Sequence, residues 1–249
     1  MIEITDAHIN RLIQLESGIT YAADKDDGRP NYRVIDSPSK VLLSAPHGAQ
    51  TFRNNRYEKW HSEDGYTAGM CLLLAELSSV SAIATTFPNF EYDPNYSRFD
   101  VPYKIALKDL VEKNGIRYVL DIHGASFHSV KMDQADKIDL GYRSSRNDAD
   151  RSMRKKHIDE FISILENIAG ERYTLDFQVS HNKFAARRCY TITSFVHNLS
   201  VTRSNPDVQA LQIEMKPHLR IASNQNYRMS IKTMLQAFVN FLDYLEHTA

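Results

Sequence analysis

Two histidines stand in matching settings in this sequence, each directly after a short apolar run and directly before a glycine. His47 lies in the segment SAPHG (residues 44–48) and His123 lies in LDIHG (120–124). A short apolar run beside Gly or Pro is typical of a buried strand, and open α/β sheets bind ligands beyond the carboxyl ends of their strands. One histidine in such a place is usually structural, but two with the same flanks predict a shared metal site. We attribute the glycines to a sharp backbone turn and to the close approach of a ligand.

A carboxylate ligand is expected from the segment after His47. There Ser62 predicts the start of a helix with Glu63 and Asp64 in its first turn. The helix dipole alone also favours acids at this position, so the sequence leaves open whether either one binds a metal. Two imidazoles and one carboxylate leave an open coordination position on zinc, which is the ligand set of catalytic rather than structural zinc sites.

Glu214 ends another apolar run, ALQI (210–213). Burying an unpaired carboxylate is costly, so this residue needs a metal, a cation or a raised pKa. One interpretation is an ion pair with an arginine such as Arg220 or Arg98. The other is a general base, because a glutamate beside a metal-activated water can take its proton and deliver it to a leaving amine.

Three arginines are candidates for binding a substrate carboxylate. Arg98, Arg187 and Arg188 lie in predicted loops near the strand ends. Arginine holds a carboxylate through two parallel charge-assisted hydrogen bonds. Most loop arginines, however, are simply exposed to solvent. Arg98 is the strongest candidate because it shares a loop with Asp93 and Asn95.

Hydrophobic periodicity predicts strands that alternate with helices. The predicted helices cover 1–16, 62–77, 103–114, 148–169 and 224–246, and the predicted strands cover 41–44, 81–86, 117–122, 173–179, 190–196 and 208–215. This alternation predicts a three-layer α/β/α fold with a mixed, mostly parallel sheet. We expect residues 1–249 to form one domain.

The composition is that of a folded protein without a strong global charge. With 30 basic and 31 acidic residues, the formal net charge of -1 gives no general attraction to nucleic acid or to a membrane surface. Residues 1–6 lack a basic segment followed by an apolar core, and no apolar run approaches the ~18 residues of a membrane span. We therefore expect a soluble cytoplasmic protein whose partner is a small molecule.

Together these segments resemble the N-formylglutamate amidohydrolase family, which is itself similar to the zinc carboxypeptidase and aspartoacylase group. The matching segments are SAPHG (44–48), EDGYT (63–67), DPN (93–95) with Arg98, LDIHG (120–124) and LQIE (211–214). The chain departs from the family at 182–187, where it has NKFAAR instead of a segment like Asn-x-Pro-Phe-x-Gly-Gly. It also has Gly124 where serine is common. Both differences concern the substrate more than the metal chemistry.

The resemblance implies a phosphorylase/hydrolase-like fold and one bound zinc ion, with another divalent metal as the alternative. The implied zinc ligands are His47, Asp64 and His123, with Glu63 as the alternative acid. These ligands would leave room on the metal for a water and a substrate carbonyl.

The resemblance also assigns residues to catalysis and to the substrate. It implies that Glu214 is the general base. Asn95 and Arg98 would hold the substrate carboxylate or polarise the scissile carbonyl, and Arg187 is our further candidate for substrate binding.

The resulting hypothesis is a zinc-dependent hydrolase that cleaves the C–N amide bond of an N-acyl amino acid, such as N-formylglutamate, or of a small peptide. One alternative is a non-catalytic protein that captures an acidic metabolite, which would bind no stoichiometric metal. A second alternative is a metal-dependent hydrolase of esters or a metallopeptidase acting on peptidoglycan-derived peptides.

Overall fold

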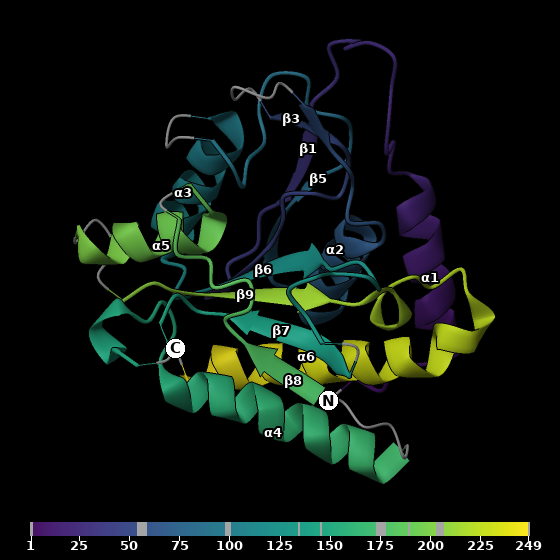
Figure 1. Ribbon diagram of the computed structural model, residues 1–249, viewed down its shortest axis with the longest axis vertical. Coiled ribbons are helices and arrows are strands. Elements are labelled where there is room, and N and C mark those ends of the chain that lie inside the picture. The colour runs from purple at the N-terminus through teal and green to yellow at the C-terminus, as the bar shows by residue number, and fades with distance from the viewer. Residues whose placement is uncertain are drawn as a thin grey trace.

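A seven-stranded mixed sheet forms the centre of the molecule. The computed structural model describes residues 2–53, 59–97, 101–133, 135–144, 146–172, 178–188, 190–202 and 207–248. The strands lie in the order β1 (Tyr32–Ile35), β5 (Ser81–Thr85), β2 (Val41–Ala45), β6 (Tyr118–Gly124), β9 (Gln209–Met215), β7 (Asp136–Gly141) and β8 (Gln178–His181). The four strands β5, β2, β6 and β9 are parallel, whereas β1 runs against β5. Figure 1 shows β7 running against β9, with β8 parallel to β7.

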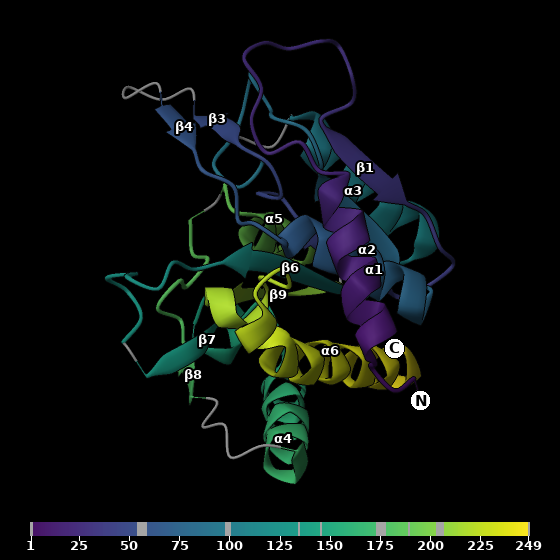
Figure 2. The same ribbon diagram turned by 90° about the vertical axis from the view of Figure 1, so that its right-hand side faces the viewer.

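Helices cover both faces of this sheet, as Figures 1 and 2 show. One face packs against α1 (Asp6–Ser17), α2 (Thr67–Ser78), α4 (Lys155–Arg172) and α6 (Arg228–Thr248). The other face packs against α3 (Pro102–Asn114) and α5 (Ile192–Val201). The predicted three-layer α/β/α fold with a mixed, mostly parallel sheet is confirmed. Among the described residues, no helix is both long and apolar enough to cross a membrane.

A small second sheet stands apart from the seven strands. It consists of β3 (Thr51–Arg53) and β4 (Lys59–His61), which pair in antiparallel fashion. Figure 2 shows this pair projecting from the body of the molecule near the end of the main sheet. The sequence did not predict these strands, nor β1 and β7, because runs this short or this polar carry little periodicity.

The face toward α3 and α5 changes from apolar to polar along the central strands. Val119 of β6 and Ala210 of β9 pack into the core beneath these helices. Further along the same face, Asp121 lies opposite Gln212, and His123 lies opposite Glu214. Residues two apart on a strand share a face, so alternation in β6 and β9 places four buried polar side chains side by side. This polar half of the face is the floor of the candidate site.

One predicted strand is wrong, and a second is tested only in part. Residues 190–196 were expected to form a strand, but Ile192–Val201 forms helix α5. Thr191 caps this helix by accepting a hydrogen bond from the backbone N–H of Ser194 at 3.2 Å. The β-branched residues at its start favour a strand, but the apolar spacing continues to Leu199 at helical intervals. For the predicted strand 173–179, residues 173–177 lie outside the described part, and β8 begins at Gln178.

Helix α2 begins later than the sequence predicts. Ser62 was expected to cap it, but its first residue is Thr67, and the preceding Tyr66 adopts a left-handed φ of 69°. The cap comes instead from Glu16 of α1, whose carboxylate accepts hydrogen bonds from the backbone N–H groups of Tyr66 (2.5 Å) and Gly69 (2.8 Å). Asp64 therefore lies three residues before the helix rather than in its first turn.

Gly48 is required by packing rather than by ligand approach. A Cβ at this position would collide with the carbonyl oxygen of Thr85 and with the Cβ of Ala68. Its φ is not among the positive values that favour glycine. The absent side chain lets the end of β2 lie directly against α2, which brings the segment of His47 close to Asp64: the backbone N–H of Asp64 donates to the His47 carbonyl at 2.7 Å.

We predict that Gly48→Ala lowers the free energy of unfolding by about 1–3 kcal/mol, because the added methyl group meets a carbonyl and a side chain that have no room to move. Gly170→Ala is the matched control, since its Cβ would meet nothing within 4 Å. That variant should be about 0.5–1 kcal/mol more stable, as expected for glycine replaced within a helix. Denaturant titration of both variants measures the difference, and equal stabilities would contradict the close packing at Gly48.

Candidate metal centre

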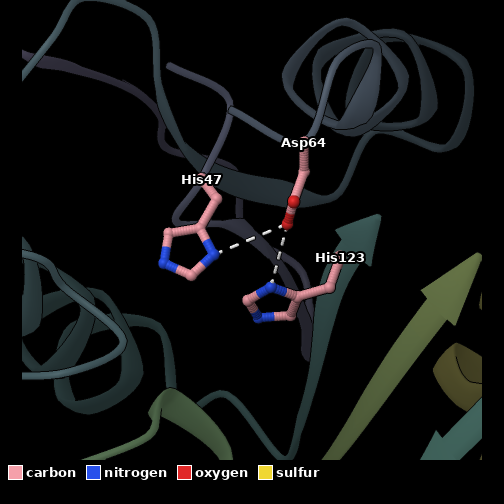
Figure 3. Close-up of side chains that lie close together, drawn as sticks. All are labelled: His47, Asp64 and His123. Carbon is pink, nitrogen blue, oxygen red and sulfur yellow. Dashed lines mark hydrogen bonds and ion pairs between the residues drawn. The ribbon is translucent and has the colours of Figure 1, made fainter. Parts of the chain in front are cut away.

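Two histidines and one aspartate meet at the carboxyl end of the sheet. The Asp64 Oδ2 atom lies 3.5 Å from Nδ1 of His47 and 3.3 Å from Nδ1 of His123. Figure 3 shows both rings turned toward this carboxylate, with His123 at the tip of its strand and Asp64 just before a helix. All three side chains are buried, and their ligand atoms are close enough together to hold one metal ion. Glu63, the alternative acid, lies outside this group, 3.4 Å from the side chain of Gln50.

A second carboxylate holds each histidine ring from behind. The Nε2 atom of His47 lies 2.8 Å from Oδ1 of Asp93, and Nε2 of His123 lies 3.1 Å from Oδ2 of Asp121. A carboxylate at Nε2 favours the tautomer with its proton there, which leaves the Nδ1 lone pair facing Asp64. Asp93 is itself fixed by the Nε atom of Arg53 at 2.6 Å. This carboxylate–histidine arrangement is typical of metal ligands.

The electrostatics of the group favour a cation at its centre. Burial disfavours the charged form of His47, but the charges of Asp93 and Asp64 overcome this and raise its pKa to about 9. His123 is affected in the same way by Asp121 and Asp64, and its pKa is raised well above the usual value. Burial also opposes ionisation of Asp64, yet the two histidines hold its pKa far below the usual range. Two imidazole nitrogens and a carboxylate oxygen fit zinc and leave open positions on the ion.

Glu214 lies beside this group in the neighbouring strand. It is directly opposite His123 in the β6–β9 register and is buried. Burial raises its pKa to about 7, against the positive charge of His123, and Asp64 adds to the rise. Gln212 donates a hydrogen bond from Nε2 to Oε1 of Glu214 at 2.8 Å, which fixes the carboxyl group. A carboxyl group with this pKa can both accept and donate a proton near neutral pH.

One cavity of about 420 Å³, a size suited to a small molecule, is lined by the two histidines and Asp64 together with Gln212 and Glu214. Asn95 lies at its wall, where its Nδ2 atom is 3.4 Å from Nε2 of His123 and its Oδ1 accepts a hydrogen bond from the backbone of Ile192. Arg187 lines the same cavity and donates through Nε to the carbonyl of Arg143. Arg98 lies outside the described residues, so its role stays a prediction.

The loop that carries Arg187 is anchored by a buried acid of the sheet. Asp139 of β7 accepts hydrogen bonds from the backbone N–H groups of Lys183 (3.1 Å) and Phe184 (2.8 Å). At Gly141, a Cβ would collide with the carbonyl oxygen of Phe184. The 182–187 segment, which departs from the family pattern and supplies the cavity-lining residues 184–187, is therefore packed tightly against β7.

Several site residues were not predicted from the sequence. Asp121 and Gln212 carry a signal, because each lies two positions before a predicted site residue and so shares its face of the strand. No sequence signal indicated His61, because it lies on β4 and only the tertiary structure brings it to the cavity. Its ring stacks on that of His47 at a centroid distance of 4.3 Å, and burial together with the positive charge of His47 lowers its pKa to about 4. Neutral His61 thus forms part of the cavity wall.

Comparisons with known proteins bear on the fold. A scan against models of protein families finds no match, and a search of curated proteins finds none. Among solved structures, N-formylglutamate amidohydrolase from Ralstonia eutropha JMP134 matches with a TM-score of 0.60 at 14% identity, over 88% of this chain and 99% of that one. This chain has the fold of that enzyme. The predicted resemblance is confirmed at the level of the fold.

Two further solved structures share the architecture. A protein from Agrobacterium tumefaciens is 13% identical, with a TM-score of 0.53 over 88% of this chain and 97% of that one. A protein from Burkholderia mallei, whose description is "putative carboxypeptidase", is 12% identical, with a TM-score of 0.50 over 97% of this chain and 69% of that one. At these identities the two structures show a shared fold.

We predict that Asp93→Asn lowers the pKa of His47 by roughly one to three units, because the variant removes the negative charge behind the ring. Since the folded-state pKa of about 9 exceeds the usual 6.5, protonated His47 stabilises the fold below pH 6.5, and this contribution is lost as the pH rises through about 9. NMR titration of the imidazole in chelator-treated protein measures the change. Asp159→Asn, at an exposed acid of α4, is the control. An unchanged His47 titration in the Asp93 variant would contradict the assignment.

Proposed function

We propose that this protein is a zinc-dependent hydrolase that cleaves the C–N amide bond of an N-acyl amino acid, such as N-formylglutamate, or of a small peptide. The observation that carries the proposal is the buried His47–Asp64–His123 group with Glu214 beside it in the same cavity. The fold shared with N-formylglutamate amidohydrolase supports it. A fold alone does not define an activity, so the proposal rests on the residues of the site.

The metal would be held by Nδ1 of His47, Nδ1 of His123 and Oδ2 of Asp64. Zinc in such a site polarises a substrate carbonyl and lowers the pKa of water to ~7. Asp93 and Asp121 keep the two rings in the tautomer and orientation that present Nδ1. Metal binding at Nδ1 must displace the Nδ1 proton of each protonated ring and leaves the proton on Nε2, so affinity should rise with pH.

Glu214 is the proposed general base. In its ionised form it accepts a proton from the water that attacks the carbonyl carbon, and the carboxyl group then donates this proton to the leaving nitrogen as the C–N bond breaks. The products are a carboxylic acid and an amine. A pKa of about 7 suits both steps, because at neutral pH the carboxylate can take the proton from water and the carboxyl group can give it to the leaving nitrogen.

The cavity favours a substrate with a negative charge. Lys131, Arg187 and Arg188 line it. Guanidinium groups bind carboxylates in a bidentate manner, so Arg187 is proposed to hold a carboxylate of the substrate. Asn95 has its amide near His123 and is proposed to orient the acyl group. Arg98 keeps the role in substrate binding that the sequence predicts for it.

We predict that Asp64→Asn lowers zinc affinity strongly, because a neutral amide replaces the one anionic ligand between the two rings. Glu63→Gln is the matched control: it makes the same acid-to-amide change at the adjacent residue, outside the group, and should keep wild-type affinity. Elemental analysis and chelator competition measure both variants. Loss of zinc from the Glu63 variant but not from the Asp64 variant would reverse the assignment.

We predict that Glu214→Gln keeps stoichiometric zinc but loses turnover by about 10²–10⁴-fold, the usual contribution of a general base. The substrate is found first by screening the wild-type protein with formyl-, acetyl- and peptidyl-glutamate and aspartate. In zinc-loaded wild type, kcat/KM should rise with pH as Glu214 ionises, with a midpoint below the pKa of about 7 of the metal-free site, because the cation favours the carboxylate.

Full activity of the Glu214 variant would exclude this residue as the base. A wild-type protein that binds no zinc after supplementation, yet binds acidic metabolites, would favour the non-catalytic alternative.

A further inference from the structure

Arg220 makes contacts that none of the proposed catalytic steps uses. It lies just after β9, next to the short 3-10 turn Pro217–Leu219, and its side chain is buried. The guanidinium donates to three backbone carbonyls: from Nη1 to Gly65, from Nη2 to Ala125 at 3.4 Å and from Nε to Met215 at 3.2 Å. Planar donors pointing in several directions suit arginine rather than lysine for such a role.

The three carbonyls follow the residues of the proposed site in the chain. Gly65 and Met215 come directly after Asp64 and Glu214, and Ala125 comes two residues after His123. The segments are far apart in sequence and come from different elements: the approach to α2, the end of β6 and the end of β9. One guanidinium therefore joins the backbones on which the acid ligand, a histidine ligand and the base depend.

Gly124 makes this arrangement possible. A Cβ at Gly124 would lie 2.6 Å from Cζ and 2.7 Å from Nε of Arg220, which is closer than real side chains approach. Any side chain at position 124 must therefore displace the guanidinium. Gly124 is also the position where the family resemblance leads one to expect serine, so Arg220 and Gly124 form a matched pair in this chain.

We propose that Arg220 is a positioning residue that fixes the spacing of Asp64, His123 and Glu214, and that Gly124 is kept small to admit it. The part that concerns metal affinity rests on the proposed function. The positive charge of Arg220 also lies near Asp64 and Glu214 and favours their ionised forms. Its geometry and its charge are separable, because lysine keeps the charge but has all its donors on one atom, in place of three nitrogen atoms spread over a rigid plane.

The test compares Arg220→Lys, Gly124→Ala and the double variant with Gly170→Ala, a glycine whose Cβ would meet nothing. Amide hydrogen exchange in chelator-treated protein reports, in the absence of metal, on the three backbone segments that Arg220 joins. The amides of Thr67, bonded to the Asp64 carbonyl, and Ala125, bonded to the Met215 carbonyl, are the reporters. Zinc dissociation constants from chelator competition report on the site.

Both single variants should exchange at Thr67 and Ala125 about tenfold faster or more, as expected when buried carbonyls lose their donors. Each should bind zinc about 10–100-fold more weakly, the range seen when groups that orient ligands are lost. The double variant should be no worse than Arg220→Lys alone, because the methyl group then meets a slimmer side chain. Gly170→Ala should bind zinc like wild type and exchange no faster at either reporter, since its added methyl group is expected only to stabilise the helix.

Unchanged exchange at both reporters in the two single variants would overturn the proposal. So would equal acceleration at the core amide of Leu211, since that would indicate general destabilisation. If the wild type binds no zinc while the reporters respond as expected, the positioning role stands and the zinc hydrolase proposal fails. Gly124→Ala leaves Arg220 in the chain, so a folding failure of the lysine variant does not remove the test.

Discussion

The burial of negative charge at one end of the sheet is the constraint on which the rest of this structure depends. The buried carboxyl groups of this region include Asp64, Asp93, Asp121 and Glu214. Buried charges are costly unless they are balanced. The chain balances them with two histidines whose pKa values are raised, with Arg53 against Asp93, and with Arg220 beneath the site. A cation between His47 and His123 completes this balance in the proposed function.

Strand pairing determines which of these groups meet. The register of β6 against β9 sets Asp121 opposite Gln212 and His123 opposite Glu214, so a shift of β9 by one residue would turn Gln212 and Glu214 toward the opposite layer. The beginnings of the same strands are apolar on this face and pack beneath α3 and α5. The core thus holds the register on which the site depends. Contacts outside the sheet, from Glu16 and Arg220, then hold the segments that strand pairing does not control.

The sequence predicts the parts of this molecule whose signals are local. Long periodic elements such as 209–215 and 228–248 follow from hydrophobic pattern, and two strand ends with His-Gly indicate the site. The helix at 192–201 was missed because its first residues favour a strand and only the longer spacing shows a helix. Arg53 and His61 could not be found, since β3 and β4 reach the cavity only through tertiary packing. The sequence shows glycine at positions 48 and 124, but the residues that exclude a side chain there, Ala68 and Arg220, are distant in the sequence.

In the proposed function, His47, Asp64 and His123 bind one zinc ion. X-ray absorption spectroscopy at the zinc edge, on protein loaded with one equivalent, tests this ligand set directly. We expect two imidazole nitrogens at roughly 2.0–2.1 Å with oxygen ligands at about 2.0–2.2 Å and no sulfur. Replacing Asp93 with Asn should leave this ligand set in place, because Asp93 orients His47 rather than the metal. A sulfur ligand, a single imidazole, or zinc that binds equally well after both histidines are replaced would contradict the account.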